Sequence, residues 1–360
     1  MKKVVISGYY GFDNVGDDAM VETFSTILKN KELDVTVLSK NPDKTKKQFN
    51  INAIDRSNPF KIMSEIKKSD ILISGGGTLL QDITTVASIW YYLFIILLGI
   101  FLKKETYILF QGMGPINNKF NIWLTRKILS KVNYIVLRDN KSLEEMKRLE
   151  FDISRTIVAT DLIFGLKVPE EKENTQLIKK YIQNYSNEKT YIGVSLRPWK
   201  NIRNEVNFAR VLDKIANEHN AEIVFIPFHK SQDYAFTVKV IEKMETKNHL
   251  IYGEFLPSQV AGLMSLMSLN IGVRLHSLVF STIANVPTIG ISYDPKIDGF
   301  LQDIGMKAVS DYSKLNEEAI LKEVGKIFND KYDKKVFENT DSRKKIINEI
   351  MGDILDGKCK

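Results

Sequence analysis

The sequence predicts an α/β protein that contains two doubly wound domains. Short apolar runs typical of buried parallel strands alternate with helical patterns along most of the 360 residues. One polar segment rich in Lys and Asn, residues 171–189, divides this alternation into two series. We therefore expect Rossmann-like domains over residues 1–170 and 190–360, joined by this linker, with the active site in a cleft between them.

The composition and the distribution of charge argue against a nucleic-acid-binding protein. The chain is 44% hydrophobic and 26% charged, which is ordinary for a globular protein. Its net charge of +7 is spread over Lys-rich helix faces, whereas a nucleic-acid-binding protein typically has a clustered basic stripe. We expect no nucleic-acid partner, and the charge instead favours an anionic substrate or an anionic membrane surface.

Disulfide, thiol and metal chemistry are poorly supported. The one cysteine is Cys359, and no metal-ligand spacing is present, so we expect no metal and no cofactor. Residues 1–8 are typical of a first strand and lack the features of a signal peptide. The expected location is therefore cytoplasmic.

A first glycine-rich loop follows the strand predicted at residues 4–7 and leads into a helix. Its spacing is not G-x-G-x-x-G, and Asp17 and Asp18 at the helix start would repel a pyrophosphate, which argues against a nucleotide site. Either carboxylate could cap the helix. Alternatively, one of them, beside Asn14, accepts hydrogen bonds from sugar hydroxyls or acts as a base.

A second glycine-rich loop follows the strand predicted at residues 70–74. Gly75, Gly76 and Gly77 are followed by Thr78 and Gln81. Three glycines after a buried strand can form a concavity lined by backbone, which suits a phosphate or an acceptor sugar. Alternatively, the glycines only permit a tight turn.

The most apolar segment is Val86–Leu102, followed by Lys103 and Lys104. Its 17 residues are at the short limit for a membrane span, and strand-like segments continue on both sides. We expect a helix packed in or against the fold. Its aromatic residues and lysines are also compatible with peripheral contact with a bilayer interface.

Several polar side chains follow predicted strands, and ligands of open α/β sheets bind at the carboxyl ends of strands. In the first domain, Arg138 is a candidate anion ligand, or it forms a salt bridge with Asp139 or Glu145. In the second domain, five residues are expected to meet on one rim: Arg197, His229, Arg274, His276 and Tyr293.

The stretch from Gly272 to Ser277 lies between a predicted strand and a predicted helix. Because side chains alternate along a strand, Arg274 and His276 would point the same way, beside the N–H groups of the helix start. A fixed cation and a proton donor together suit a doubly charged phosphate ester that must be protonated. Taken singly, each residue could be a satisfied structural group.

Three segments in order, residues 8–19, 74–82 and 274–277, resemble the polysaccharide pyruvyl transferase family, in particular its CsaB-type members. The resemblance implies a GT-B-like fold of two facing Rossmann-type domains. It also implies transfer of the pyruvyl group of phosphoenolpyruvate to a sugar as a ketal. The implied acceptor is N-acetylmannosamine in a lipid-linked precursor of the secondary cell-wall polymer that S-layer proteins bind. Asp17-Asp18 stands where Asp-Glu is more usual, which leaves the acceptor open.

The resemblance assigns roles that fit these side chains. His276 would protonate the methylene carbon as general acid, Arg274 with Arg197 or Arg138 would hold the anion, and Asp18 or Asp17 would orient or deprotonate the acceptor. The remaining substrate-binding candidates are Leu275, Ser277, His229, Tyr293, Asn14, Gly75, Gly76, Gly77, Thr78 and Gln81.

Two other functions remain open at this stage. A GT-B nucleotide-sugar glycosyltransferase would share the architecture, but no acidic residue late in the chain stands out for binding ribose. A non-enzymatic assembly protein docked on a membrane through residues 86–102 would tolerate the loss of Arg274 and His276. For the transferase, the expected partners are phosphoenolpyruvate and a lipid-linked sugar at the inner face of the cell membrane.

Overall fold

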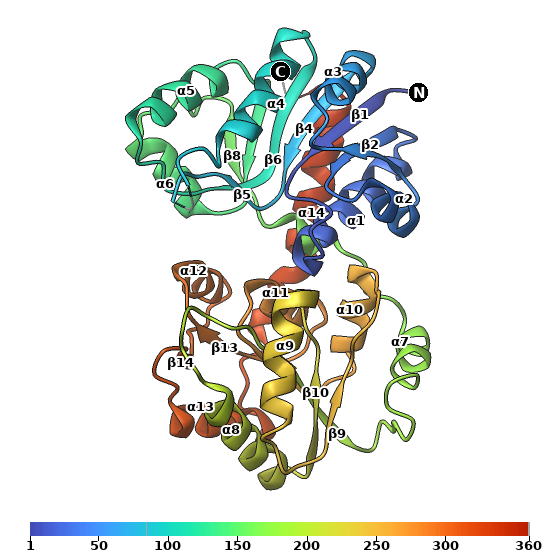
Figure 1. The fold of residues 1–360 in the computed structure, drawn as a ribbon, viewed down its shortest axis with the longest axis vertical. Helices are drawn as coiled ribbons and strands as arrows, with labels where there is room; N and C mark the ends of the chain where they lie inside the picture. Colours follow the sequence, from blue (N-terminus) through green and yellow to red (C-terminus); the bar gives the residue numbers. More distant parts are fainter. Residues whose placement is uncertain (84, 359–360) are drawn as a thin grey trace. The chain divides into compact units, whose positions relative to one another are not determined.

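The computed structural model describes residues 1–83 and 85–358, so Cys359 lies outside the described residues. The chain divides into two compact units, which are described separately. Unit 1 comprises Met1–Leu166 and Asp341–Lys360, and unit 2 comprises Lys167–Thr340. Figure 1 shows both units as parallel sheets flanked by helices.

Unit 1 contains an eight-stranded sheet with the order β3-β2-β1-β4-β6-β7-β8, and β5 pairs with β6. All of these pairs are parallel. The strands are β1 (Lys3–Ser7), β2 (Asp34–Ser39), β3 (Asn52–Asp55), β4 (Ile71–Gly75), β5 (Thr78–Leu80), β6 (Glu105–Met113), β7 (Tyr134–Leu137) and β8 (Thr156–Val158). The helices are α1 (Val15–Asn30), α2 (Pro42–Phe49), α3 (Pro59–Lys68), α4 (Trp90–Phe101), α5 (Lys119–Leu129), α6 (Asn140–Arg148) and the 3₁₀ helix η1 (Leu162–Gly165).

Most helices of unit 1, though not α4, begin at residues whose side chains cap them. Asn14, Asn41, Asn58, Asn118 and Asp139 each accept a hydrogen bond from a backbone N–H in the first turn of α1, α2, α3, α5 and α6. Each cap satisfies a donor that the helix itself leaves unpaired. The sequence thereby fixes where the loops end at the carboxyl edge of the sheet.

Unit 2 contains a six-stranded parallel sheet with the order β11-β10-β9-β12-β13-β14. The strands are β9 (Thr190–Ser195), β10 (Ala221–Phe225), β11 (Asn248–Leu250), β12 (Leu269–Gly272), β13 (Thr288–Ser292) and β14 (Ser310–Asp311). The helices are α7 (Glu171–Ile178), α8 (Glu205–Glu218), α9 (Lys230–Ile241), α10 (Pro257–Met264), α11 (Leu275–Ile283), α12 (Pro295–Asp303) and α13 (Glu317–Phe328), and α14 (Lys335–Leu355) leads back into unit 1.

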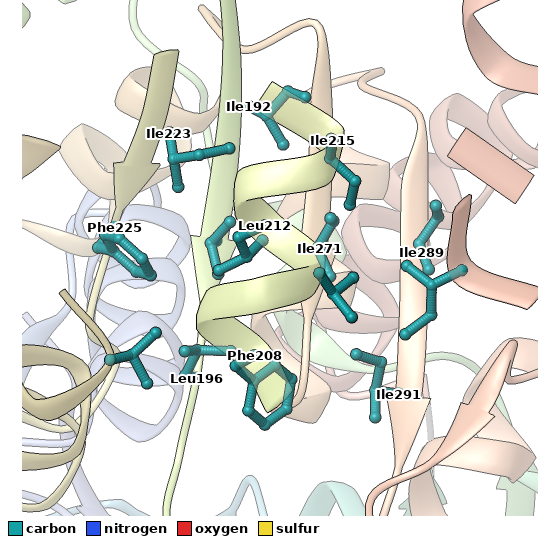
Figure 2. Close-up of a cluster of buried hydrophobic side chains, with 14 of the residues drawn as sticks. Ile192, Leu196, Phe208, Leu212, Ile215, Ile223, Phe225, Ile271, Ile289 and Ile291 are labelled. Carbon is teal, nitrogen blue, oxygen red and sulfur yellow. The ribbon is translucent and has the colours of Figure 1, made fainter. Parts of the chain in front are cut away.

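One hydrophobic core of unit 2 lies between α8 and the sheet. Figure 2 shows Phe208, Leu212 and Ile215 on one face of α8, pointing toward side chains of the strands such as Ile223 and Ile271. These side chains are almost completely buried. This packing holds β9, β10 and β12 rigidly and therefore positions the loops that follow them.

The predicted domain boundaries differ from this division. The segment predicted as a linker belongs to unit 2, where α7 packs on α10 and Asn174 Nδ2 donates to Ser265 Oγ over 3.2 Å. The C-terminal residues, predicted within the second domain, return to unit 1. There Ile347 is fully buried and Arg343 Nη1 donates to Thr160 Oγ1 over 3.3 Å. Ile347, Met351 and Ile354 form a buried apolar stripe on α14, and its burial is the physical reason for the return.

The apolar segment predicted at residues 86–102 contains α4, which packs against β4, β5 and β6. Tyr92, Leu93, Ile95, Ile96 and Leu98 face the core. No helix in the part of the chain that the structure describes is long and apolar enough to cross a bilayer.

Candidate functional site

The strand order places most of the predicted site residues at the switch point of each sheet, where the order in which the chain adds strands reverses from one side to the other. In unit 1, β2 and β4 lie on opposite sides of β1, and in unit 2, β10 and β12 lie on opposite sides of β9. Ligands of doubly wound sheets bind at the carboxyl ends of the strands at such a switch point. The loops after β1, β4, β9 and β12 are the loops that carry most of the predicted residues.

Arg274 follows β12 and is held by a buried carboxylate. Its Nε and Nη2 donate to the two Oδ atoms of Asp233, over 2.6 and 2.5 Å. The side chain of Asp233 is completely buried, and its Oδ2 also accepts from the backbone N–H groups of Phe228 and His229. This bidentate pair fixes the guanidinium at the switch point and neutralises much of its charge.

Arg197 follows β9 and lies among aromatic rings. Its guanidinium carbon lies 4.4 Å from the ring centroid of Tyr293 and 5.2 Å from that of Trp199, and its Nη1 donates to the Tyr293 hydroxyl. Burial raises the pKa of Tyr293, against the opposing effect of Arg197 and Arg274, so the phenol stays protonated at neutral pH. Within the described part of the chain, no carboxylate forms a salt bridge with Arg197.

His276 lies in a helix and not in a strand. β12 ends at Gly272, Arg274 is the N-cap residue of α11, and α11 begins at Leu275. The predicted strand-to-helix turn is therefore present, but the alternation argument that placed Arg274 and His276 on one face is wrong, since the helix has already begun. Instead, His276 is the second residue of α11 and Ser277 is the third, in the turn where backbone N–H groups favour anions.

His229 and Tyr293 lie, as predicted, beyond the carboxyl ends of two other strands of unit 2. His229 caps α9, and its Nδ1 accepts from the Gln232 backbone N–H at 3.5 Å. Tyr293 directly follows β13. Their predicted contacts with substrate stay predictions.

In unit 1, the helix cap differs from the prediction. Asn14, and not Asp17 or Asp18, is the N-cap residue of α1, and both aspartates lie in the first turn. The Asn14 amide donates to Asp17, whose side chain is buried. Asp18 is partly exposed. The two carboxylates thus stand at the switch point of this sheet, beside the positive end of the α1 dipole.

The second glycine-rich loop has the backbone that its sequence predicts. Gly76 and Gly77 have φ angles of +74° and +67°, which favour glycine. A Cβ at Gly77 would lie 3.7 Å from Asp17 Oδ1, so the two loops of unit 1 meet. Gly75 accepts a 2.6 Å hydrogen bond from the Tyr10 hydroxyl, whose pKa is raised well above its usual value by burial and by Asp17. The Gln81 side chain lies near Gly114, the residue that directly follows β6.

Arg138 has partners within unit 1. It donates to Asp139, to Asp161 over 3.4 Å and to Thr78 Oγ1 over 3.0 Å. The predicted salt bridge to Asp139 is therefore present, whereas Glu145 pairs with Arg148. Arg138 holds the glycine-rich loop through Thr78, and two carboxylates balance its charge.

The second glycine-rich loop and the Arg274 turn lie within a segment that matches a known protein family. Residues 14–295 match the Polysaccharide pyruvyl transferase family. The chain belongs to this family. It is also 22% identical over 312 residues to "Amylovoran biosynthesis protein AmsJ" of Erwinia amylovora, a match that covers 81% of this chain and 74% of that protein. The protein is therefore an enzyme, a polysaccharide pyruvyl transferase.

Comparisons with solved structures establish the fold of this transferase as GT-B. A putative UDP-N-acetylglucosamine 2-epimerase from Listeria monocytogenes superposes with a TM-score of 0.68 at 13% identity, covering 98% of this chain and 96% of that chain. UDP-GlcNAc 2-epimerase from Methanocaldococcus jannaschii gives a TM-score of 0.66 at 17% identity, covering 98% and 99%. At this identity the likeness concerns the fold alone.

The transferase has a second arginine–aromatic cluster that the sequence reasoning missed. Tyr9 and Phe12, in the first glycine-rich loop, stack with ring centroids 4.0 Å apart. Arg56 follows β3, lies 5.2 Å from the Phe12 ring and 4.3 Å from the Tyr91 ring, and donates to the Gly8 carbonyl over 3.1 Å. The rule that ligands bind after strands would have found Arg56 as well, had the strand at residues 52–55 been predicted.

The two units of the transferase therefore offer different chemistry. Unit 2 presents Arg197, Arg274 and His276, which suit an anion and a proton transfer. Unit 1 presents Asp17, Asp18 and stacked rings, which suit sugar hydroxyls and sugar faces. Among residues 1–83 and 85–358, no group of three or more His, Cys, Asp or Glu side chains is placed to hold a metal ion.

Proposed function

We propose that the transferase moves the pyruvyl group of phosphoenolpyruvate to two hydroxyls of one sugar, forming a ketal. Membership of the family supports the reaction class. The observation that supports the donor is Arg197, a guanidinium without a carboxylate partner in the described structure, at the same switch point as Arg274. Phosphoenolpyruvate carries a carboxylate and a phosphate, so it requires more than one cation.

In the proposed reaction, His276 gives a proton to the methylene carbon of phosphoenolpyruvate, which leaves an oxocarbenium-like centre at C2. One sugar hydroxyl attacks C2 and loses its proton to Asp18 or Asp17. The bond between C2 and the phosphate oxygen then breaks, and Arg197 and Arg274 stabilise the departing phosphate. A second hydroxyl attacks C2 and gives its proton to the now neutral His276, which yields the ketal and inorganic phosphate and restores the acid.

We propose that unit 1 binds the acceptor, through Asn14, Asp17 and the stacked rings of Tyr9 and Phe12. The acceptor that the sequence resemblance favours is an N-acetylmannosamine residue of a lipid-linked precursor of the secondary cell-wall polymer, the polymer that anchors S-layer proteins. The relative in Erwinia amylovora is described as an amylovoran biosynthesis protein, which supports a polysaccharide precursor as the general class.

The test is phosphate release from phosphoenolpyruvate in the presence of a lipid-linked N-acetylmannosaminyl disaccharide analogue, with mass analysis of the sugar. We expect a mass gain that corresponds to a pyruvate ketal. His276→Ala should lower kcat by about 10²- to 10⁴-fold, with phosphoenolpyruvate binding retained. Arg197→Ala should weaken that binding at least about tenfold in calorimetric titration.

Arg210→Ala is the matched control, because Arg210 is an exposed arginine of α8 that pairs with Glu317. It should leave both measurements unchanged. Full turnover in His276→Ala and Arg197→Ala would overturn the assignment of residues. Binding of a uridine nucleotide without any binding of phosphoenolpyruvate would overturn the donor and favour a nucleotide-sugar glycosyltransferase.

A further inference from the structure

We infer that α3, α4 and α5 of unit 1 form a docking surface for an anionic lipid bilayer. The structure has 17 large hydrophobic side chains that are exposed among its described residues, and ten of them lie between Phe60 and Trp123. These ten, here called the apolar surface, are Phe60, Met63, Ile83, Val86, Trp90, Phe94, Leu97, Phe101, Phe120 and Trp123. Such a concentration is unusual for a surface that faces only water.

Helix α4 carries apolar side chains on its exposed side as well as on the side that packs against the sheet. Trp90, Phe94, Leu97 and Phe101 recur at helical spacing and are 43–78% exposed. The opposite side of the helix packs on the sheet through residues such as Ile95 and Leu98. A helix that only filled the core would need apolar residues on the packed side alone.

The two neighbouring helices extend the apolar surface. α4 contacts both α3 and α5, and Figure 1 shows α4 drawn between them. Phe60 and Met63 on α3 are exposed, as are Phe120 and Trp123 on α5, whose rings lie 5.8 Å apart. All three helices precede parallel strands or connect them, so all begin at the carboxyl edge of the sheet and run toward the opposite edge.

Basic residues lie at the ends of the same three helices. α3 ends with Lys67 and Lys68, Lys103 follows the end of α4, and Lys127 lies near the end of α5. All four lysines are exposed, and within the described residues none of them forms a salt bridge. Between Arg56 and Lys131 the sequence has ten basic residues and four acidic ones.

Exposed aromatic side chains along the three helices, with unpaired lysines at the helix ends, match the chemistry of an anionic bilayer. Trp and Phe insert at the level of the headgroups, and lysines are attracted to the negative surface potential. A second copy of the chain would bring the same lysines against each other, which disfavours self-association through this surface. The aromatic residues at the helix starts also lie at the sheet edge that carries the glycine-rich loops, where a membrane-bound acceptor would arrive.

The experiment is co-sedimentation of the full-length protein with vesicles of phosphatidylcholine, with and without phosphatidylglycerol. It contains no substrate, so its outcome is independent of the proposed reaction. We expect at least tenfold more binding to the vesicles that contain phosphatidylglycerol, and weaker binding at high salt. The double variant Phe94→Ser/Phe101→Ser should lower this binding at least tenfold, and Lys67→Glu/Lys103→Glu should do the same.

Matched controls lie on unit 2. Val206→Ser removes an exposed apolar side chain of α8, and Lys172→Glu reverses an exposed lysine of α7; both should bind as the wild type does. Because Phe94 and Phe101 are exposed, their variants should keep the wild-type melting temperature. Equal binding of wild type and both double variants, or no binding to either vesicle, would overturn the proposal. Self-association that the Phe94→Ser/Phe101→Ser variant abolishes, without vesicle binding, would also overturn it.

Discussion

At the scale of single residues, three arginines that all follow parallel strands differ in their electrostatic surroundings. Arg138 is balanced by Asp139 and Asp161, and Arg274 by the buried Asp233, whereas Arg197 contacts aromatic rings and hydroxyl or carbonyl oxygens. A guanidinium that already has a carboxylate partner offers less net charge to an incoming anion. This difference selects Arg197 over Arg138 as the proposed second ligand of phosphoenolpyruvate.

The pair of Arg274 and Asp233 leads to a prediction about stability. Arg274→Ala leaves a fully buried carboxylate without its bidentate partner, so we expect a loss of about 3–5 kcal/mol in the free energy of unfolding. Urea denaturation measures it. The double variant Asp233→Asn/Arg274→Met, which removes both charges, should recover part of the loss. An unchanged midpoint for Arg274→Ala would show that the pair is not buried as described.

At the scale of elements, the sequence predicts strands and helices better than it predicts contacts between them. The alternation of apolar runs with helical patterns locates the strand–loop–helix units, because this signal is local. The prediction that His276 lies on a strand is wrong because α11 begins directly after Arg274. No capping side chain marks the start of this helix. The partnership of Arg274 with Asp233, 41 residues away, follows from the order of β10 and β12 in the sheet, which no local pattern reveals.

Strand β10 provides a prediction about pH. Glu222 accepts hydrogen bonds from Lys189, Lys247 and His249, which tie together the starts of β9, β10 and β11. Burial raises the pKa of Glu222, but these three hydrogen bonds outweigh it and lower the pKa from 4.5 to about 2. Since the folded-state pKa is depressed, the stabilisation is complete above about pH 4.5 and is lost as the pH falls toward 2.

We expect this contribution to be about 1–2 kcal/mol, because solvent screens the half-exposed lysines. The measurement compares the unfolding free energy of the wild type and Glu222→Gln between pH 6 and pH 3. The variant should be less stable at pH 6, and the difference should shrink on acidification. Glu218→Gln, an exposed site on α8, serves as control. A difference that does not change with pH would contradict the assigned cause.

At the scale of the whole molecule, the domain boundary was the least predictable feature. The polar composition of residues 171–189 is typical of a linker, yet α7 packs on α10. The apolar stripe of α14 shows that this helix covers a core but does not show which core, because both units offer similar sheets. Only its observed surroundings, such as the position of Ile347 beside Gly165 of η1, assign it to unit 1.

Helix α14 therefore allows a test of how the chain is divided. Ile347→Ala should destabilise unit 1 by about 2–5 kcal/mol, since a buried isoleucine leaves a cavity. Hydrogen exchange measured by peptide should show lost protection in α1 and η1, with the strands of unit 2 unchanged. Ile346→Ala, at an exposed neighbouring position, should have little effect. Lost protection confined to unit 2 would contradict the division.

The return of α14 to unit 1 also has a consequence for the order of folding during synthesis. Residues 1–166 leave the ribosome first, but the helix that buries part of their surface is translated only after the whole of unit 2. Unit 2 is thus contiguous and can complete its fold while translation continues, whereas unit 1 must wait with an uncovered apolar strip. A nascent chain that stalls before residue 341 carries a finished unit 2 and an unfinished unit 1.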